Sequence, residues 1–179
     1  NAAGVELDVD VTVKYHYTGT FAASPEVQTK AATWYQQGVD AIFACGGSLG
    51  QSAMAAAEIE GGKVIGVDVN QSADSDTVIN SAMKMLGVAV QMALEDHFDG
   101  TWVGGTTWTL DASNNGIGLP TDTESFRFET WTLAEYQELF DDMADGTLVV
   151  TVDIEQGVDA ATLATFDATL PNVTISFEA

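Results

Sequence analysis

A strand, a glycine-rich turn and a helix follow one another between residues 40 and 59, and a second apolar strand comes directly after them. The segment 40–45 (DAIFAC) is a continuous apolar run, typical of strands that are buried on both faces of a parallel sheet. The run at 63–69 (KVIGVDV) is of the same kind. Neighbouring strands joined through a helix run parallel, with a right-handed crossover. This unit constrains the fold more than any other part of the chain, and it predicts an α/β protein.

The segments on either side extend the same pattern. A strand is predicted at 9–17, and the next helix begins after Ser24 and ends at Gly38, because serine caps helix starts and glycine favours helix ends. A short strand at 76–83 leads into a further helix that ends near Gly100. The apolar face of that helix is expected to carry Met83, Gly87, Val90 and Leu94. This order of elements predicts a doubly wound parallel sheet.

After Gly100 the alternation of strands and helices becomes irregular. The clearest element is a helix at 132–146, because Thr132 and Glu135 fit a capping box and Gly146 fits its end. The other elements predicted in this part are a strand with a turn at 105–120 and two strands at 147–154 and 172–178.

The charge balance excludes some classes of partner. The chain has 27 acidic and 5 basic residues and a net charge of −22, which disfavours binding to nucleic acid or to anionic membrane surfaces. No stretch approaches the roughly 20 apolar residues of a membrane-spanning helix. The single cysteine, Cys45, cannot form an internal disulfide and is predicted to be a small buried residue.

Polar residues follow the two central strands where each one ends. Gly46 and Gly47 would let the backbone approach a ligand, and Ser48 with Gln51 fits a capping box that leaves backbone N–H groups pointing at the site. Asp68 comes at the end of the next strand. If the two strands are neighbours, about 4.8 Å apart, Asp68 shares the crevice of the glycine loop.

These residues favour a neutral, hydroxylated ligand. The loop has neither the lysine of a phosphate-binding P-loop nor the glycine spacing of a dinucleotide fingerprint. A carboxylate in the crevice would repel a phosphate, but it can accept two hydrogen bonds from the vicinal diol of a sugar. The alternative is that the glycines only tighten a turn and that Asp68 only caps the following loop.

The sequence predicts no catalytic residue, no cofactor and no metal. His16 and His97 lie far apart and have no ligand partner at zinc-site spacing, and no nucleophile elbow is present. The segment 111–122 matches a calcium loop in part, but Gly118 and Pro120 depart from that pattern. A hairpin turn at Asn115 and Gly116 is the preferred interpretation.

Several motifs together resemble a known family. They are YHYTGTF, GVDAIFACGGSLGQSAMAAAE, KVIGVDVNQS, TVINSAMKM and DGTWVGGTTWTL, in this order. The chain is similar over nearly its whole length to the basic membrane protein family, the nucleoside-binding lipoproteins of ABC import systems. The resemblance implies a type 1 periplasmic-binding-protein fold, in which two α/β lobes enclose the ligand and are joined by three crossovers.

The resemblance also implies roles for five residues. Phe21 would stack on a purine base, and Gly46 and Gly47 would approach the ligand through their backbone. Asp68 would bind the ribose hydroxyls, and Lys84, which stands at an otherwise apolar helix start, would reach the same sugar. The glycine loop reads GGSLG where the family commonly has GGTG, so one backbone contact is expected to differ.

The implied organisation has three parts. Residues 1–99 would form a ligand-binding lobe, 100–130 a returning segment toward a first lobe that precedes this chain, and 131–179 the completion of the lobe. The implied partners are a purine nucleoside or a related hydroxylated ligand and an ABC permease. The expected location is extracellular, as a cell-surface lipoprotein with its anchor outside this chain, or periplasmic. One lobe alone is expected to bind nucleosides no tighter than about millimolar.

Two other classes of function use the same architecture. One is the ligand-sensing effector domain of a regulator, which the charge and the missing helix-turn-helix disfavour. The other is a sugar- or nucleoside-handling enzyme that uses Asp68, for which the sequence offers no second convergent acid or base.

Overall fold

The computed structural model describes residues 10–150 and 172–178. The chain divides into two compact units, one formed by residues 20–150 and the other by residues 1–19 with 151–179.

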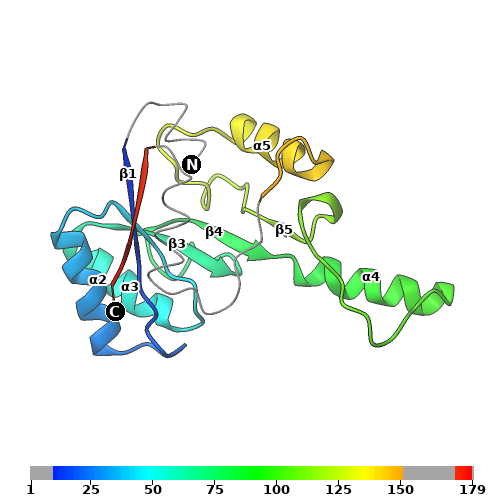
Figure 1. Cartoon of the computed structure of the whole chain (residues 1–179), viewed down its shortest axis with the longest axis horizontal. Helices are drawn as coiled ribbons and strands as arrows, with labels where there is room; N and C mark the ends of the chain where they lie inside the picture. Colours follow the sequence, from blue (N-terminus) through cyan, green and yellow to red (C-terminus); the bar gives the residue numbers. More distant parts are fainter. Residues whose placement is uncertain (1–9, 151–171, 179) are drawn as a thin grey trace. The chain divides into compact units, whose positions relative to one another are not determined.

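The larger unit is built on a mixed four-stranded sheet. Its strands are β2 (Ala41–Phe43), β3 (Lys63–Asp68), β4 (Val78–Lys84) and β5 (Ile117–Gly118), in the order β2-β3-β4-β5 (Figure 1). The first three run parallel, and β5 runs antiparallel to the carboxyl end of β4. The predicted α/β class with a parallel sheet is confirmed.

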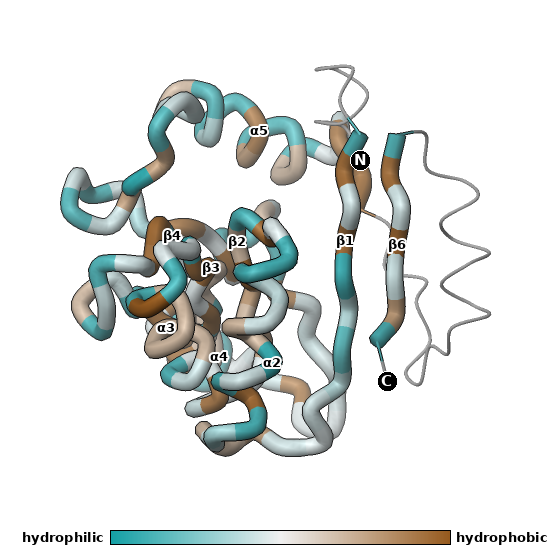
Figure 2. Tube along the Cα trace, turned by 90° about the vertical axis from the view of Figure 1, so that its left-hand side faces the viewer, coloured by the Kyte–Doolittle hydropathy of each residue, from teal (hydrophilic) through white to brown (hydrophobic). Residues whose placement is uncertain are grey.

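Two helices pack against each other and against this sheet. They are α2 (Pro25–Gln36), which Ser24 caps by accepting a hydrogen bond from the Val27 N–H, and α3 (Leu49–Glu60). Figure 2 shows hydrophobic residues gathered on β3 and β4 beside α3. The buried core is formed by Val27, Ala31, Tyr35, Ile42, Ala44, Leu49, Ala53, Met54, Ala56, Ala57, Val64 and Val78.

The prediction that the run 40–45 is buried on both faces is wrong. Ile42 and Ala44 are buried, whereas Phe43 is 53% exposed and Cys45 is exposed. Successive side chains of a strand point to opposite faces. Ile42 and Ala44 therefore pack into the core with residues of α2 and α3. Phe43 points to the opposite face, where the described residues leave about half of it exposed.

Helix α4 (Leu86–Asp99) follows β4 directly, and Lys84 is the last residue of that strand rather than part of a helix start. None of the residues of α4 is buried among the described residues. Its apolar stripe is exposed to solvent and consists of Leu86, Val90, Leu94 and Phe98. No helix in the described part of the chain is long and apolar enough to span a bilayer.

The segment beyond α4 is mostly irregular, and the strand predicted from residue 105 onward is reduced to β5. A turn of 3-10 helix (Ala112–Asn114) precedes it, and Asp111 caps that turn by accepting a hydrogen bond from the Ser113 N–H. Helix α5 (Leu133–Asp145) is confirmed, with the capping box of Thr132 and Glu135.

The smaller unit contains a two-stranded parallel sheet. Strand β1 (Val11–Tyr15) pairs with β6 (Val173–Phe177), in a register that places Val11 opposite Val173. The strands predicted at 9–17 and 172–178 are therefore confirmed. The strand predicted at 147–154 is not formed over 147–150, and the rest of it lies outside the described residues.

Candidate functional site

The structure brings the polar strand ends to one edge of the sheet. Strands β2, β3 and β4 run parallel, so their carboxyl ends meet there. Phe43 pairs with Ile65, and Gly46 lies three residues beyond the end of β2, in the loop that follows it. Asp68 in turn pairs with Met83, the neighbour of Lys84. Three of the predicted site residues therefore come from three adjacent strand ends.

Asp68 has an unusual backbone conformation. Its φ is 70°, and the Val69 N–H donates to the Val67 carbonyl at 2.8 Å, which closes a γ-turn with Asp68 at its centre. Residues with side chains rarely adopt this left-handed conformation, which costs about 1–3 kcal/mol and tends to occur at functional sites. β3 therefore ends on a strained acidic residue.

The carboxylate of Asp68 pairs with the ammonium of Lys84. Nζ of Lys84 lies 2.7 Å from Oδ1, which is shielded from solvent. The hydrogen bond and the negative charge of Asp68 raise the pKa of Lys84 above its ordinary value. Oδ2 of Asp68 makes no hydrogen bond to the described residues, and the side chain is 41% exposed, so one oxygen remains open to a ligand.

The loop after β2 is tightly wound. The Cys45 N–H donates to the Phe43 carbonyl and the Gly46 N–H to the Ala44 carbonyl. Gly47 then takes a φ of 55°, which glycine adopts without strain. The N–H groups of Gly47 and Ser48 make no hydrogen bond to the described residues, so both can donate to a ligand.

The predicted capping box of Ser48 and Gln51 is wrong. Ser48 does stand at the N-cap of α3, but it makes no side-chain capping bond. Its backbone is helical (φ −74°, ψ −6°) rather than extended, as a capping serine normally is. The hydroxyl bonds instead to the segment that carries Phe21.

Phe21 lies against the glycine loop. Its carbonyl accepts a hydrogen bond from the Leu49 N–H at 3.1 Å and one from the Ser48 hydroxyl at 3.2 Å. A Cβ at Gly47 would stand 3.2 Å from the same carbonyl, so this chain itself makes a close approach there. The glycines therefore do tighten this turn, which is the alternative role that the sequence left open. Phe21 is 78% exposed, so it is accessible to a ligand.

Cys45 is exposed at the same edge, which corrects the prediction of a buried residue. No local pattern in the sequence indicates this exposure, because Cys45 lies beyond the end of β2, in the turn that its N–H closes with the Phe43 carbonyl.

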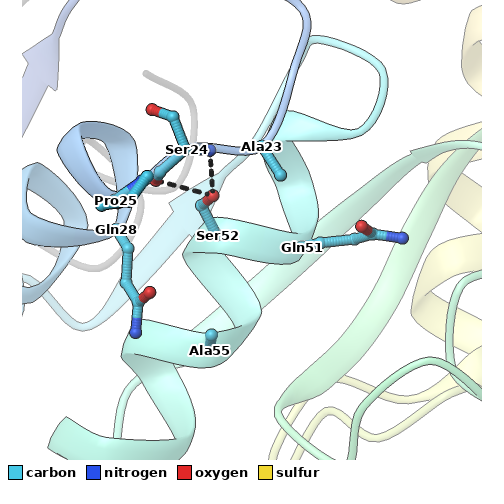
Figure 3. Close-up of a pocket in the computed structure, with 7 residues that line it drawn as sticks. All are labelled: Ala23, Ser24, Pro25, Gln28, Gln51, Ser52 and Ala55. Atoms are coloured by element: carbon cyan, nitrogen blue, oxygen red, sulfur yellow. Dashed lines mark hydrogen bonds between the residues drawn. The ribbon is translucent and has the colours of Figure 1, made fainter.

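A second polar feature lies between the N-terminal ends of α2 and α3. It is a shallow, open depression of about 330 Å³ that is lined by Ala23, Ser24, Pro25, Gln28, Gln51, Ser52 and Ala55 (Figure 3). The described residues contain no group of three histidine, cysteine or acidic side chains that could hold a metal ion. Asp111 of the calcium-like segment bonds within its own turn to Ser113.

Comparison with known proteins identifies related sequences. Residues 2–138 match the model of the Bmp family, described as ABC transporter substrate-binding protein PnrA-like. The nucleoside-binding protein BmpA of an ABC transporter in Lactococcus lactis subsp. cremoris (strain MG1363) is 30% identical over 139 residues, which cover 68% of this chain and 40% of that protein. Basic membrane protein D of Borreliella burgdorferi (strain JD1) is 30% identical over 62% of this chain and 33% of its own length.

A solved structure shares the fold. An ABC transporter solute-binding protein from Aeropyrum pernix K1 superposes with a TM-score of 0.65 at 22% identity, over 87% of this chain and 52% of that one. The chain thus spans about two fifths of the length of the first curated relative and about half of this solved structure.

Proposed function

This chain belongs to the Bmp family of PnrA-like ABC transporter substrate-binding proteins, and on that premise we propose that the carboxyl edge of its sheet binds the sugar of a purine nucleoside. The family consists of binding proteins, as the sequence led us to expect, and not of enzymes. The observation that carries the proposal is the Asp68 carboxylate, which has one oxygen held by Lys84 and the other open at the meeting point of three strand ends.

Each residue of the edge has a chemical role in this proposal. The open oxygen of Asp68 accepts hydrogen bonds from the ribose diol, and the Lys84 ammonium donates to the same hydroxyls. The exposed ring of Phe21 stacks on the base. Gly47 contributes a free backbone N–H, and Gly46 permits the tight turn beside it.

The proposal extends to the transport system. The Lactococcus lactis relative is named as a nucleoside-binding protein of an ABC transporter, which supports a nucleoside as ligand and a permease as partner here. We further propose that residues 100–130 form a returning segment toward another lobe, while 1–99 and 131–179 belong to the ligand-binding lobe. An extracellular or periplasmic location with a lipid anchor outside this chain belongs to the same proposal.

Replacing Asp68 tests the role of the carboxylate. Asp68→Asn keeps an acceptor but removes the charge, and a hydrogen bond to a charged group contributes about 1.5–3 kcal/mol. The dissociation constant for inosine should therefore rise about tenfold or more, as measured by ligand-observed NMR titration, which reaches the millimolar range.

Two controls isolate the effect. Asp99→Asn makes the same charge change at an exposed position on α4 and should leave the affinity unchanged. A 2′,3′-dideoxy nucleoside lacks the diol and should bind the wild type and Asp68→Asn equally. An Asp68→Asn variant that keeps the wild-type affinity for inosine would show that Asp68 does not bind the ribose.

A further inference from the structure

Two serine hydroxyls on the first turns of α3 hold the segment that carries Phe21. Oγ of Ser48 donates to the Phe21 carbonyl at 3.2 Å and accepts from the Ala23 N–H at 3.3 Å. Oγ of Ser52 accepts from the Ser24 N–H at 2.9 Å and donates to the Ser24 carbonyl at 3.1 Å. Figure 3 shows this second pair of bonds. Each hydroxyl therefore bridges two backbone groups of residues 21–24.

The effect is a fixed backbone beneath an exposed ring. The Leu49 N–H donates a second bond to the Phe21 carbonyl, at 3.1 Å. Phe21 is 78% exposed, so packing of its side chain contributes little to holding the residue in place. Since ordering a loop during binding costs free energy, a ring whose backbone is already fixed binds a base more tightly than a mobile one.

We propose that Ser48 is a positioning residue for the ligand: its hydroxyl clamps the Phe21 segment to the N-terminal turn of α3 and so presents the ring to the base. This inference rests on the proposed function, because it takes Phe21 as the stacking residue. The absence of the predicted capping box supports the proposal. The Ser48 hydroxyl is not used by its own helix, and both of its bonds go to residues 21 and 23.

Ser52 bonds to a different residue of this segment, Ser24, and serves as a comparison for Ser48. It is buried, and it holds Ser24, whose own hydroxyl caps α2. Loss of the Ser52 hydroxyl should therefore reduce the stability of the whole unit. Ser48 is exposed, and its hydroxyl bonds reach only the Phe21 segment, so its loss should act on that segment and leave the unfolding temperature almost unchanged.

A double-mutant cycle tests the proposal, using Ser48→Ala, Phe21→Ala and the double variant. Ser48→Ala should weaken inosine binding about three- to tenfold, the worth of one ordinary hydrogen bond. Ser48→Thr, which keeps the hydroxyl, should bind as the wild type does. In the Phe21→Ala background, Ser48→Ala should have almost no further effect on the affinity for inosine, because the ring that Ser48 positions is then absent. If the losses of binding free energy in the two single variants add up to the loss in the double variant, the proposal is overturned. Wild-type affinity for inosine in Ser48→Ala would also overturn it.

A measurement without ligand separates the clamp from the proposed function. Amide hydrogen exchange at Ala23 should be about tenfold or more faster in Ser48→Ala than in the wild type, with Ser48→Thr close to the wild type. An unchanged exchange rate of the Ala23 amide in Ser48→Ala would show that Ser48 does not hold the Phe21 segment, whichever ligand the protein binds. Failure of the wild type to bind inosine would instead overturn the proposed function, and the positioning role with it, even where the exchange changes as expected.

Discussion

Asp68 combines two properties that are costly for stability, a left-handed backbone with φ 70° and a carboxylate oxygen, Oδ1, that is shielded from solvent. Its ion pair with Lys84 does little to offset them, since water screens the attraction between exposed charges. Glycine adopts φ 70° without a Cβ clash. An aspartate at this position is therefore expected where the carboxylate itself is needed, as in the proposed contact with ribose.

The first residue-scale prediction is that Asp68→Gly does not destabilise the protein. Relief of about 1–3 kcal/mol of strain should balance or exceed the lost ion pair and the entropy cost of glycine, about 0.5–1 kcal/mol. The free energy of unfolding, measured in urea, should be unchanged or up to about 1 kcal/mol higher. Asp40→Gly, at an exposed position without a positive φ, should be destabilising by about 0.5–1 kcal/mol. Equal losses of unfolding free energy in Asp68→Gly and Asp40→Gly would show that the backbone of Asp68 is not strained.

The positions of the proposed site residues Asp68 and Lys84 could be predicted from the sequence, but the hydrogen bonds around them could not. Asp68 and Lys84 reach one edge because the apolar runs before them form parallel strands, and such runs are visible in the sequence. The γ-turn at Asp68 and the bonds of Ser48 depend on how segments distant in sequence approach each other. No local pattern records that the Ser48 hydroxyl meets residues 21 and 23, more than twenty positions away.

At the scale of elements, α3 and α4 look alike in sequence and differ in the structure. Both are rich in apolar residues, yet α3 has seven buried residues and α4 has none. Met54 of α3 is 4% exposed, whereas Leu94 of α4 is 52% exposed. The two helices should therefore contribute unequally to the stability of this chain.

A pair of alanine variants measures that difference. Met54→Ala removes a buried side chain and should cost about 2–5 kcal/mol of unfolding free energy. Leu94→Ala removes a mostly exposed side chain of similar size from a helix, and should cost less than about 1 kcal/mol. Urea unfolding of both variants gives the comparison. Similar costs would mean that the Leu94 stripe is packed in solution.

Elements with local signals were predicted well. The ends of α5 are encoded by Thr132, Glu135 and Gly146 within its own sequence, and the predicted box is present. The exposure of Phe43 and of the α4 stripe could not be predicted, because an apolar side chain is buried only when another element covers it. The strand expected from residue 105 failed for a related reason, since a strand needs a partner to complete its hydrogen bonds.

At the scale of the whole molecule, the net charge of −22 opposes compactness through self-repulsion. We expect salt to stabilise the fold, because the Debye length shrinks from about 10 Å at about 0.1 M to about 3 Å at about 1 M. The unfolding temperature should rise by several degrees between these sodium chloride concentrations. A variant with Asp99→Lys and Glu138→Lys, both exposed, should show a smaller rise. An unfolding temperature that salt leaves unchanged or lowers would show that repulsion is unimportant here.

The central claim is that the carboxyl edge formed by β2, β3 and β4 binds a purine nucleoside. The most direct test is to titrate the isotope-labelled 179-residue chain with inosine and to follow its backbone amide NMR signals. We expect saturable shifts at Phe21, Gly46, Gly47, Asp68 and Lys84, with a dissociation constant of about 1 mM or weaker. Signals at the C-terminal end of α4, roughly 20 Å of helix beyond Lys84, should stay in place. No saturable shift at these five residues up to the solubility limit of inosine, or shifts confined to other parts of the chain, would contradict the claim.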